Sequence, residues 1–253
     1  MEDLVFDRIG PTRRPNEPMV MKQKWRSLLF LHWVVPAELL QPLLPPGLTL
    51  DTFEGNAYVG LVPFTMQGVR PVWAPAVPWL SNFAECNVRT YVHRGGASPG
   101  VWFFSLDAAN PVAVAIARLI WKLPYFIAAM EVRTDAPDHS ITYVTRRKLP
   151  PPLPAESRFA WTPTGVPSVA IPGTLEHFLV ERYILYAYAY GRLWRGKVHH
   201  TPYPLQTADL QSLSDTSLTA AGIKLPDNQL ERPALIHYAS GVDVDVFPLR
   251  PLA

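Results

Sequence analysis

The 253-residue chain is nearly neutral, with 23 lysines and arginines against 21 aspartates and glutamates, and 48% of its residues are hydrophobic. This composition supports a sizeable core and excludes general disorder. A nucleic-acid-binding surface is also disfavoured, because the basic residues are scattered apart from a short cluster at 146–148. The 28 prolines disfavour long helices and favour many short strands joined by rigid turns.

Cys86 is the only cysteine, so an internal disulfide is excluded, and no signal peptide opens the chain. The longest apolar runs fall short of the ~20 residues that a membrane helix needs. We therefore expect a soluble, cytoplasmic protein with no membrane partner and no nucleic-acid partner. A homo-oligomer is left open.

The chain begins with a polar segment and then enters one domain. Residues 1–20 contain three prolines and no sustained period, which predicts an arm on the surface or on a partner. Residues 21–253 contain no repeat and no clear boundary, so a single domain is expected. Within it, residues 24–35 predict an apolar strand, in which His32 is expected to be a hydrogen-bonded core residue.

Two segments rich in turn residues follow. Residues 48–53 and 57–66, separated by Glu54-Gly55-Asn56, predict a β-hairpin. The run 69–79 is rich in proline and holds two tryptophans, so it is too rigid and too poor in donors for a central strand. We interpret it as a loop at the rim of a pocket.

The stretch 81–131 contains the densest set of chemical groups. Residues 83–92 alternate with period two, which places Glu85, Asn87 and Arg89 on one face. That face fits either a solvated surface or the wall of a polar cavity, and the sequence leaves the two open.

The same stretch continues through a sharp reversal. The glycine-rich segment 94–100 turns the chain into a returning strand, 101–108. Asn110 then caps a short helix that ends near Trp121, and a third strand begins at Tyr125.

Short elements alternate with turns in the rest of the chain. A hairpin is predicted from residues 125–133 and 140–147 around a turn at 135–138. An edge strand is predicted at 158–162, and a helix begins at Thr174. Further short elements are expected in the ranges 183–190, 196–200, 207–213, 215–221 and 234–238.

Six blocks in fixed order carry a family resemblance: LLPPGLTLDTFEGNAYVGLVPF, FAECNVRTYV, GVWFFSLDA, ARLIWKLPY, LEHFLVERYILY and VHHTPYPLQ. Over nearly all of residues 25–246 the chain resembles the YqjF-like family of unknown function. That family is placed with the acetoacetate decarboxylase-like superfamily. The resemblance implies a mainly β (α+β) fold, with an antiparallel sheet rolled into a cone or barrel around a ligand cavity and a few short helices.

The resemblance implies the fold, but it does not imply the same chemistry. Acetoacetate decarboxylase reacts through a lysine Schiff base, and a second lysine in its Gly-Tyr-Pro-Lys-Lys segment lowers the pKa of the first. The matching segment here is Lys122-Leu123-Pro124-Tyr125-Phe126, so both lysine positions are lost. Lys122 could substitute only if a bulge turned it to the face of Tyr125. Glu85 matches the superfamily's acidic residue on the preceding strand.

Glu85 and Arg89 form the first candidate site. Strand geometry separates their backbones by about 13 Å, so their long side chains would have to reach toward each other to form a structural ion pair or to flank one anionic ligand. Glu85 would serve as a general base if burial raised its pKa. Arg118 and Lys122 stand four apart near a helix end, where cations also interact with the terminal carbonyls.

Two further groups have structural alternatives. Glu181-Arg182-Tyr183 resembles a family motif and would bring an acid and a base to the cavity, or would form a helix-to-strand corner. His200 and His237 would hold zinc only if they converged with a carboxylate such as Glu85 or Asp107, and no metal-ligand motif supports this. We therefore expect no metal and no cofactor.

The sequence predicts a protein that binds or converts a small organic acid or carbonyl compound in a cavity, without a metal or a Schiff-base lysine. The residues expected to be catalytic are Glu85, Arg89, Tyr125 and Lys122, and those expected to bind the ligand are Arg118, Glu181, Arg182, Tyr183 and His200. Whether the protein is an enzyme is left open. The alternatives are a lyase-like relative of acetoacetate decarboxylase and a non-catalytic binding or assembly module, with lysine-dependent decarboxylation favoured least.

Overall fold

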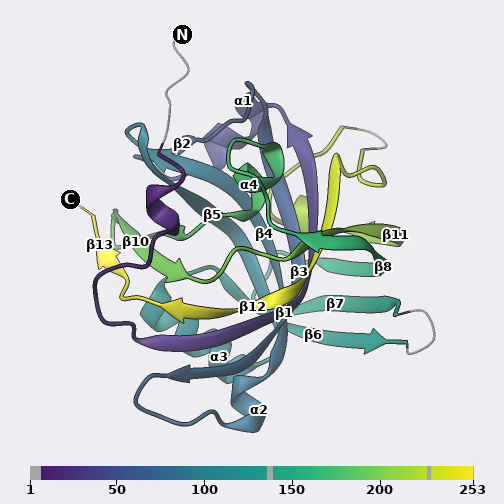
Figure 1. Cartoon of the computed structure of the whole chain (residues 1–253), viewed down its shortest axis with the longest axis horizontal. Coiled ribbons are helices and arrows are strands. Elements are labelled where there is room, and N and C mark those ends of the chain that lie inside the picture. Colours follow the sequence, from purple (N-terminus) through teal and green to yellow (C-terminus); the bar gives the residue numbers. More distant parts are fainter. Residues whose placement is uncertain (1–6, 136–138, 227–228, 253) are drawn as a thin grey trace.

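A large, strongly curved β-sheet dominates the computed structural model, and short helices connect some of its strands (Figure 1). The structure describes residues 7–135, 139–226 and 229–252. The strands are β1 (Met21–Val35), β2 (Thr49–Leu50), β3 (Ala57–Pro71), β4 (Phe83–Arg94), β5 (Ala97–Ala108), β6 (Tyr125–Thr134), β7 (Ile141–Leu149), β8 (Glu156–Ser168), β9 (Ile184–Ala189), β10 (Arg192–His199), β11 (Leu205–Asp215), β12 (Leu235–Val246) and β13 (Arg250–Pro251). The α-helices are α1 (Ala37–Leu40), α2 (Pro78–Ser81), α3 (Pro111–Ile116), α4 (Leu175–Val180) and α5 (Ser217–Ala220); Gly10–Thr12 and Gln41–Leu43 are 3₁₀ turns, and Ala117–Trp121 is a π-helical turn.

The strand pairings close the sheet into a ring. From β5 the order runs β6-β7-β8-β11-β12-β1-β3-β4 and returns to β5 through the β4–β5 pairing. Strands β9 and β10 cross this ring, because β9 pairs with β5 and β10 pairs with β12. Within the described ranges the pairings are antiparallel except β5–β6 and β5–β9. The predicted fold class, a curved and mainly antiparallel sheet with few short helices, is therefore confirmed.

Strands β1, β3 and β4 form a wall that is buried on both faces. In β1, Leu28 and Phe30 enter one hydrophobic cluster, whereas Leu29 and Leu31 enter a second cluster on the other side. Successive side chains of a strand point to opposite faces, so a strand covered on both sides needs a near-continuous apolar run. The residues from Leu28 to Val35 provide that run.

His32 is the polar exception in this run. Its side chain is completely buried, and its Nε2 lies 2.6 Å from the hydroxyl of Tyr91. Burial lowers the pKa of His32 well below its ordinary value, so the ring stays neutral. The prediction of a hydrogen-bonded core histidine is confirmed.

The stretch 81–131 folds as its sequence predicts. Strands β4 and β5 pair across the glycine-rich reversal, and α3 with its π-helical turn leads into β6. Asn110 caps α3, because its side-chain oxygen accepts hydrogen bonds from the backbone N–H groups of Val112 and Ala113. This segment positions most of the polar groups considered below.

Two predicted elements are wrong in their pairing. Strand β2 pairs with β4 instead of forming a hairpin with β3, because β1 and β4 already occupy the two edges of β3. The segment 158–162 is not an edge strand, since it belongs to the longer β8, which has β7 on one side and β11 on the other. Pairing partners distant in sequence decide both cases.

The described part of the N-terminal segment lies against the domain. Arg8 forms an ion pair with Asp51 at 2.5 Å, and the N–H of Val20 donates to the carbonyl of Val246. Residues 1–6 of the predicted arm lie outside the described residues, and the division into an arm and a single domain stays a prediction.

Strands β6 and β7 pair antiparallel as predicted, whereas residues 136–138 of the turn between them lie outside the described residues. In the described ranges no helix combines the length and apolar character needed to cross a bilayer.

Candidate functional site

A cavity of about 650 Å³ lies between the wall β1-β3-β4 and the crossing strands β9 and β10. Most of its lining side chains are apolar. The polar lining residues that bear on chemistry are Glu85, Asn87 and Arg89 of β4, Tyr125 of β6, Arg182 of the α4–β9 corner, and Tyr203. The face of β4 that the sequence left open therefore lines a cavity.

Glu85 is the most strongly perturbed acid of this group. Its side chain is 1% exposed, and burial raises its pKa from 4.5 to about 8, although hydrogen bonds from Tyr125 and Asn87 oppose the rise. The hydroxyl of Tyr125 donates to Oε2 of Glu85 at 3.1 Å. At neutral pH Glu85 is therefore mostly protonated, and a modest change in its surroundings would ionise it.

Arg89 lies on the same face of β4 but does not neutralise Glu85. No ion pair joins the two side chains, both of which belong to the described residues, so the structural ion-pair alternative is wrong. Instead, Nη2 of Arg89 donates to the carbonyl of Leu179 at 3.0 Å, while its buried Nε hydrogen-bonds to none of the described residues. A ligand in the cavity would therefore meet a cation and a neutral acid on one strand.

Arg182 brings a second guanidinium to the cavity from the corner between α4 and β9. Its Nη1 donates to Asp51 Oδ2 at 2.7 Å and its Nε donates to the carbonyl of Phe178 at 2.6 Å. These contacts fix the orientation of the group, and among the described residues its buried Nη2 has no hydrogen-bond partner. Arg89 and Arg182 thus each keep a buried N–H group that bonds to none of the described residues, and a hydrogen bond to an anionic group would offset that cost in free energy.

Glu181 and Tyr183, on either side of Arg182, form a closed hydrogen-bonded group. Glu181 accepts from the hydroxyl of Tyr183 at 2.5 Å and from the backbone N–H of Tyr203 at 3.0 Å. The ring of Tyr183 stacks on His200 with centroids 4.4 Å apart. Because Glu181, Tyr183 and His200 are absent from the described residues that line the cavity, the geometry favours the helix-to-strand corner.

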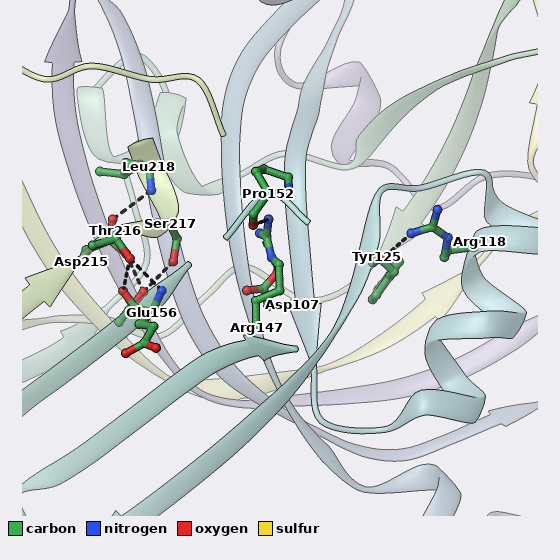
Figure 2. Close-up of polar contacts among 11 residues, drawn as sticks. Asp107, Arg118, Tyr125, Arg147, Pro152, Glu156, Asp215, Thr216, Ser217 and Leu218 are labelled. Atoms are coloured by element: carbon green, nitrogen blue, oxygen red, sulfur yellow. Dashed lines mark hydrogen bonds and ion pairs between the residues drawn. The ribbon is translucent and has the colours of Figure 1, made fainter. Parts of the chain in front are cut away.

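Lys122 and Arg118 also lie outside the cavity lining given by the described residues. Lys122 has a left-handed backbone (φ 56°) that ends the π-helical turn, and its Nζ lies 4.5 Å from the ring centroid of Trp194. Arg118 Nη1 donates to the backbone carbonyl of Tyr125 at 2.7 Å (Figure 2). The expectation that Lys122 and His200 line the cavity is therefore corrected. The left-handed turn directs Lys122 to Trp194, and stacking holds His200 against Tyr183.

The histidines do not form a metal centre in the described part of the chain. No group of three or more histidine, cysteine, aspartate or glutamate side chains there is arranged to hold a metal ion. Burial lowers the pKa of His200 to about 4, so its ring is neutral, and its Nδ1 lies 2.7 Å from the carbonyl of Thr201.

Asn87 and Tyr203 line the cavity although neither was named as a site residue. Asn87 hydrogen-bonds to Glu85 and has a buried Oδ1 without a partner. It could have been found from the sequence, because it shares the alternating face of Glu85 and Arg89. Tyr203 stands between Pro202 and Pro204 in the connection from β10 to β11, and no local pattern connects it to β4.

Comparisons with known proteins match this chain over nearly its whole length. The profile of DUF2071, an uncharacterized conserved protein, matches residues 22–243. The uncharacterized protein YqjF of Bacillus subtilis (strain 168) is 37% identical over 238 residues, which is 93% of this chain and 94% of that protein.

Three solved structures show a similar fold. An acetoacetate decarboxylase-like enzyme from Sphingomonas wittichii RW1 has a TM-score of 0.61 at 14% identity, covering 93% of this chain and 94% of that one. Acetoacetate decarboxylase from Legionella pneumophila subsp. pneumophila str. Philadelphia 1 has a TM-score of 0.60 at 14% identity, covering 96% and 92%. The enduracididine biosynthesis enzyme MppR complexed with pyruvate has a TM-score of 0.58 at 13% identity, covering 96% and 94%. At these identities the likeness shows a shared fold.

Proposed function

We propose, from the premise that this chain belongs to the DUF2071 family and has an acetoacetate decarboxylase-like fold, that its cavity binds and converts a small organic acid or carbonyl compound. Family membership confirms the resemblance seen in the sequence, but the matched relative is itself uncharacterized. The proposal therefore depends on the chemistry of the cavity.

The observation that carries the proposal is the polar group inside a mostly apolar cavity. Glu85, kept mostly neutral by burial, and its partner Tyr125 line the same cavity as Arg89 and Arg182. Buried N–H groups without partners cost free energy, and a ligand carboxylate would satisfy them with charge-assisted hydrogen bonds. MppR, which shares the fold, was solved with pyruvate, a compound that combines a carboxylate and a carbonyl group.

Glu85 is the proposed general acid and base. With a pKa of about 8 it exists in both protonation states near neutral pH, which suits proton transfer in both directions. As an acid it would donate its proton to a carbonyl oxygen of the ligand. As a carboxylate it would accept a proton from the carbon next to that carbonyl.

A lysine Schiff base is not part of this proposal. Tyr125 stands at the position where the resemblance expects a lysine, and none of the described lining residues is a lysine. The alternative of a non-catalytic binding module shares the same cavity and differs only in the absence of turnover.

The size of the cavity narrows the ligand class. About 650 Å³ with mainly apolar walls is the scale of a drug-sized ligand, so we infer an acid or carbonyl compound that carries an apolar group. We also infer a cytoplasmic setting, in which the buried free thiol of Cys86 stays reduced.

Ligand titration tests the binding step. The full chain would be titrated with pyruvate, acetoacetate and 2-oxo acids that carry longer aliphatic or aromatic groups, and followed by tryptophan fluorescence, because Trp25 and Trp121 line the cavity. We expect saturable binding that tightens with the apolar group. Arg89→Met should weaken binding about a hundredfold, since a hydrogen bond to a charged group contributes about 1.5–3 kcal/mol.

The exposed Arg133 provides the matched control, and Arg133→Gln should bind as the unmodified chain does. No binding by any member of the panel, or equal binding by Arg89→Met, would contradict the proposal.

Proton exchange tests the catalytic step. For a bound oxo acid, NMR in D₂O should show exchange of the protons next to the carbonyl, and Glu85→Gln should slow that exchange about 10²–10⁴-fold without abolishing binding. Binding with equal exchange in the two proteins would favour the non-catalytic module. A borohydride-trapped adduct on Lys122 would instead favour lysine chemistry.

A further inference from the structure

Exposed apolar side chains surround the mouth of the cavity. Two segments form this mouth, the loop and helix at 69–81 and the helical segment 111–121, because both line the cavity and both reach solvent. In Figure 1 their helices α2 and α3 lie together at one edge of the molecule. The exposed large apolar residues of the two segments are Val72, Trp73, Val77, Trp79, Val112, Ile116, Leu119 and Ile120.

The degree of exposure at this mouth face, as we call these two segments, is unusual for such residues. Trp73 is 83% exposed, Leu119 is 74% exposed and Trp79 is 67% exposed. Scattered apolar residues are ordinary on a protein surface, but a contiguous patch indicates an interaction surface. The two segments are joined, since the side chain of Asn110 donates to the carbonyl of Trp79 at 2.8 Å.

The charge of the mouth face is one-sided. Neither 69–81 nor 111–121 contains an aspartate or a glutamate, whereas Arg70 and Arg118 lie in these segments and Lys122 directly follows the second. The neighbouring Tyr190, 81% exposed, extends the aromatic part, because Lys122 Nζ lies 5.7 Å from its ring centroid.

The combination of exposed apolar side chains and cations without nearby carboxylates distinguishes between the possible partners of the mouth face. A second copy in a two-fold contact would place the same cations against one another without any carboxylate to neutralise them. An anionic lipid surface instead offers negative charge for the cations, an apolar layer for the leucine, isoleucine and valine side chains, and an interfacial zone that favours tryptophan and tyrosine.

We propose that the mouth face docks on an anionic lipid surface, with the cavity opening toward the lipid headgroups. This revises the expectation of no membrane partner, which rested on the absence of a spanning segment. Docking at a surface needs only an apolar face flanked by cations. Amphiphilic compounds held in the lipid layer would then have a direct path into the cavity.

Vesicle co-sedimentation tests the docking without any cavity ligand. The full chain would be mixed with vesicles of phosphatidylcholine alone or with about 30% phosphatidylglycerol, the anionic lipid. We expect the protein to pellet with the anionic vesicles, to pellet less with the neutral ones, and to be released by salt, because exposed charges are screened.

Leu119→Glu combined with Trp79→Glu provides the decisive variant, because neither residue is among the described lining residues. We expect this double variant to lower the partition coefficient at least about tenfold, given the apolar area lost from the lipid contact and the two carboxylates added. The matched control is Val166→Glu with Ile171→Glu, two exposed apolar residues outside the mouth face, which should bind vesicles as the unmodified chain does.

Three outcomes would overturn the proposal. The first is a protein that stays in the supernatant with both kinds of vesicle. The second is equal loss of binding in the mouth and control variants. The third is a dimer in sedimentation equilibrium that Leu119→Glu dissociates while no vesicle binding occurs, which would assign the face to a second copy. Oxo-acid titration without lipid stays independent of these results, so the proposed function and the docking fail separately.

Discussion

Glu85 and Asp107 are both buried carboxyl groups on the paired strands β4 and β5, but they face opposite sides of the wall. Asp107 pairs with Cys86 in the register, so its side chain lies on the face opposite Glu85. On that packed face, Arg147 forms an ion pair with Asp107 at 2.8 Å and also donates to the carbonyl of Pro152 (Figure 2). Glu85, on the cavity face, forms an ion pair with none of the described lysines, arginines or histidines.

The two pKa values follow this difference. Burial raises the pKa of Asp107 only to about 6, because Arg147 offsets part of the cost, whereas burial raises the pKa of Glu85 to about 8. Asp215, also on the packed side, accepts a hydrogen bond from the hydroxyl of Ser157. It also accepts one from the backbone N–H of Leu218 (Figure 2). The packed side therefore surrounds its acids with donors, while the cavity side leaves one acid free to change its protonation state.

The largest expected effect concerns the pH dependence of stability through Glu85. The folded chain keeps the Glu85 proton up to about pH 8, while the unfolded chain releases it near 4.5, so Glu85 lowers the free energy of unfolding as pH rises between these values. The slope for one proton is about 1.4 kcal/mol per pH unit, or about 4–5 kcal/mol across the window. Glu85→Gln should remove this slope in urea unfolding measured from pH 4.5 to 9.

An unchanged slope in Glu85→Gln would contradict the assignment of the raised pKa to Glu85. Asp209→Asn in strand β11 serves as the comparison, because Asp209 is an exposed acid on a different strand and does not line the cavity described here.

The next effect concerns the ion pair of the packed face. Arg147→Met should lower the free energy of unfolding by about 3–5 kcal/mol, because it leaves Asp107 buried without its cation. Arg146→Met, at the preceding residue, removes an exposed ion pair with Glu156. It should lower the free energy of unfolding by no more than about 1 kcal/mol. Equal losses in urea unfolding at pH 7 would show that burial does not separate the two pairs.

The smallest effect concerns the hydrogen bond between Tyr125 and Glu85. Tyr125→Phe removes a donor that stabilises the ionised carboxylate, so the pKa of Glu85 should rise further, at a cost of about 1 kcal/mol in stability. A carbon-13 NMR titration of the Glu85 carboxyl would measure the change.

Tyr143→Phe is the matched control for this titration. The Tyr143 hydroxyl donates to the backbone carbonyl of Glu85 at 2.7 Å and not to its carboxyl group. Tyr143→Phe should therefore lower the free energy of unfolding by a similar amount and leave the titration of the Glu85 carboxyl close to that of the unmodified chain. If the pKa of Glu85 shifted in Tyr143→Phe and not in Tyr125→Phe, the assignment of Tyr125 as the donor to the Glu85 carboxyl group would be contradicted.

Local signals explain which parts of this molecule could be predicted from the sequence. The alternation in β4, the glycine-rich reversal and the Asn110 cap each act within a few residues, so the segment 81–131 was predicted correctly. The face of Glu85 and Arg89 followed from the same alternation. By contrast, the partner of β2 and the interior place of β8 depend on strands distant in the sequence, which no local pattern reports.

The site was less predictable than the fold for a similar reason. Lys122 was expected near the cavity, but one residue in a left-handed conformation turns its side chain to Trp194. Tyr203 reaches the cavity only because of where the chain passes between β10 and β11. The changes at Tyr125 and Phe126, in contrast, are visible in the sequence, because the resemblance marks the positions of the two lost lysines.

The contact between Arg8 and Asp51 has a practical consequence for handling the protein. Asp51 also holds Arg182, so the N-terminal segment reaches the cavity through one shared carboxylate. Trimming the first twenty residues, or attaching a purification tag that displaces Arg8, would release one side of that carboxylate and loosen the guanidinium behind it. Affinities measured on shortened or N-terminally tagged preparations would then describe an altered pocket, and a C-terminal tag is the safer choice.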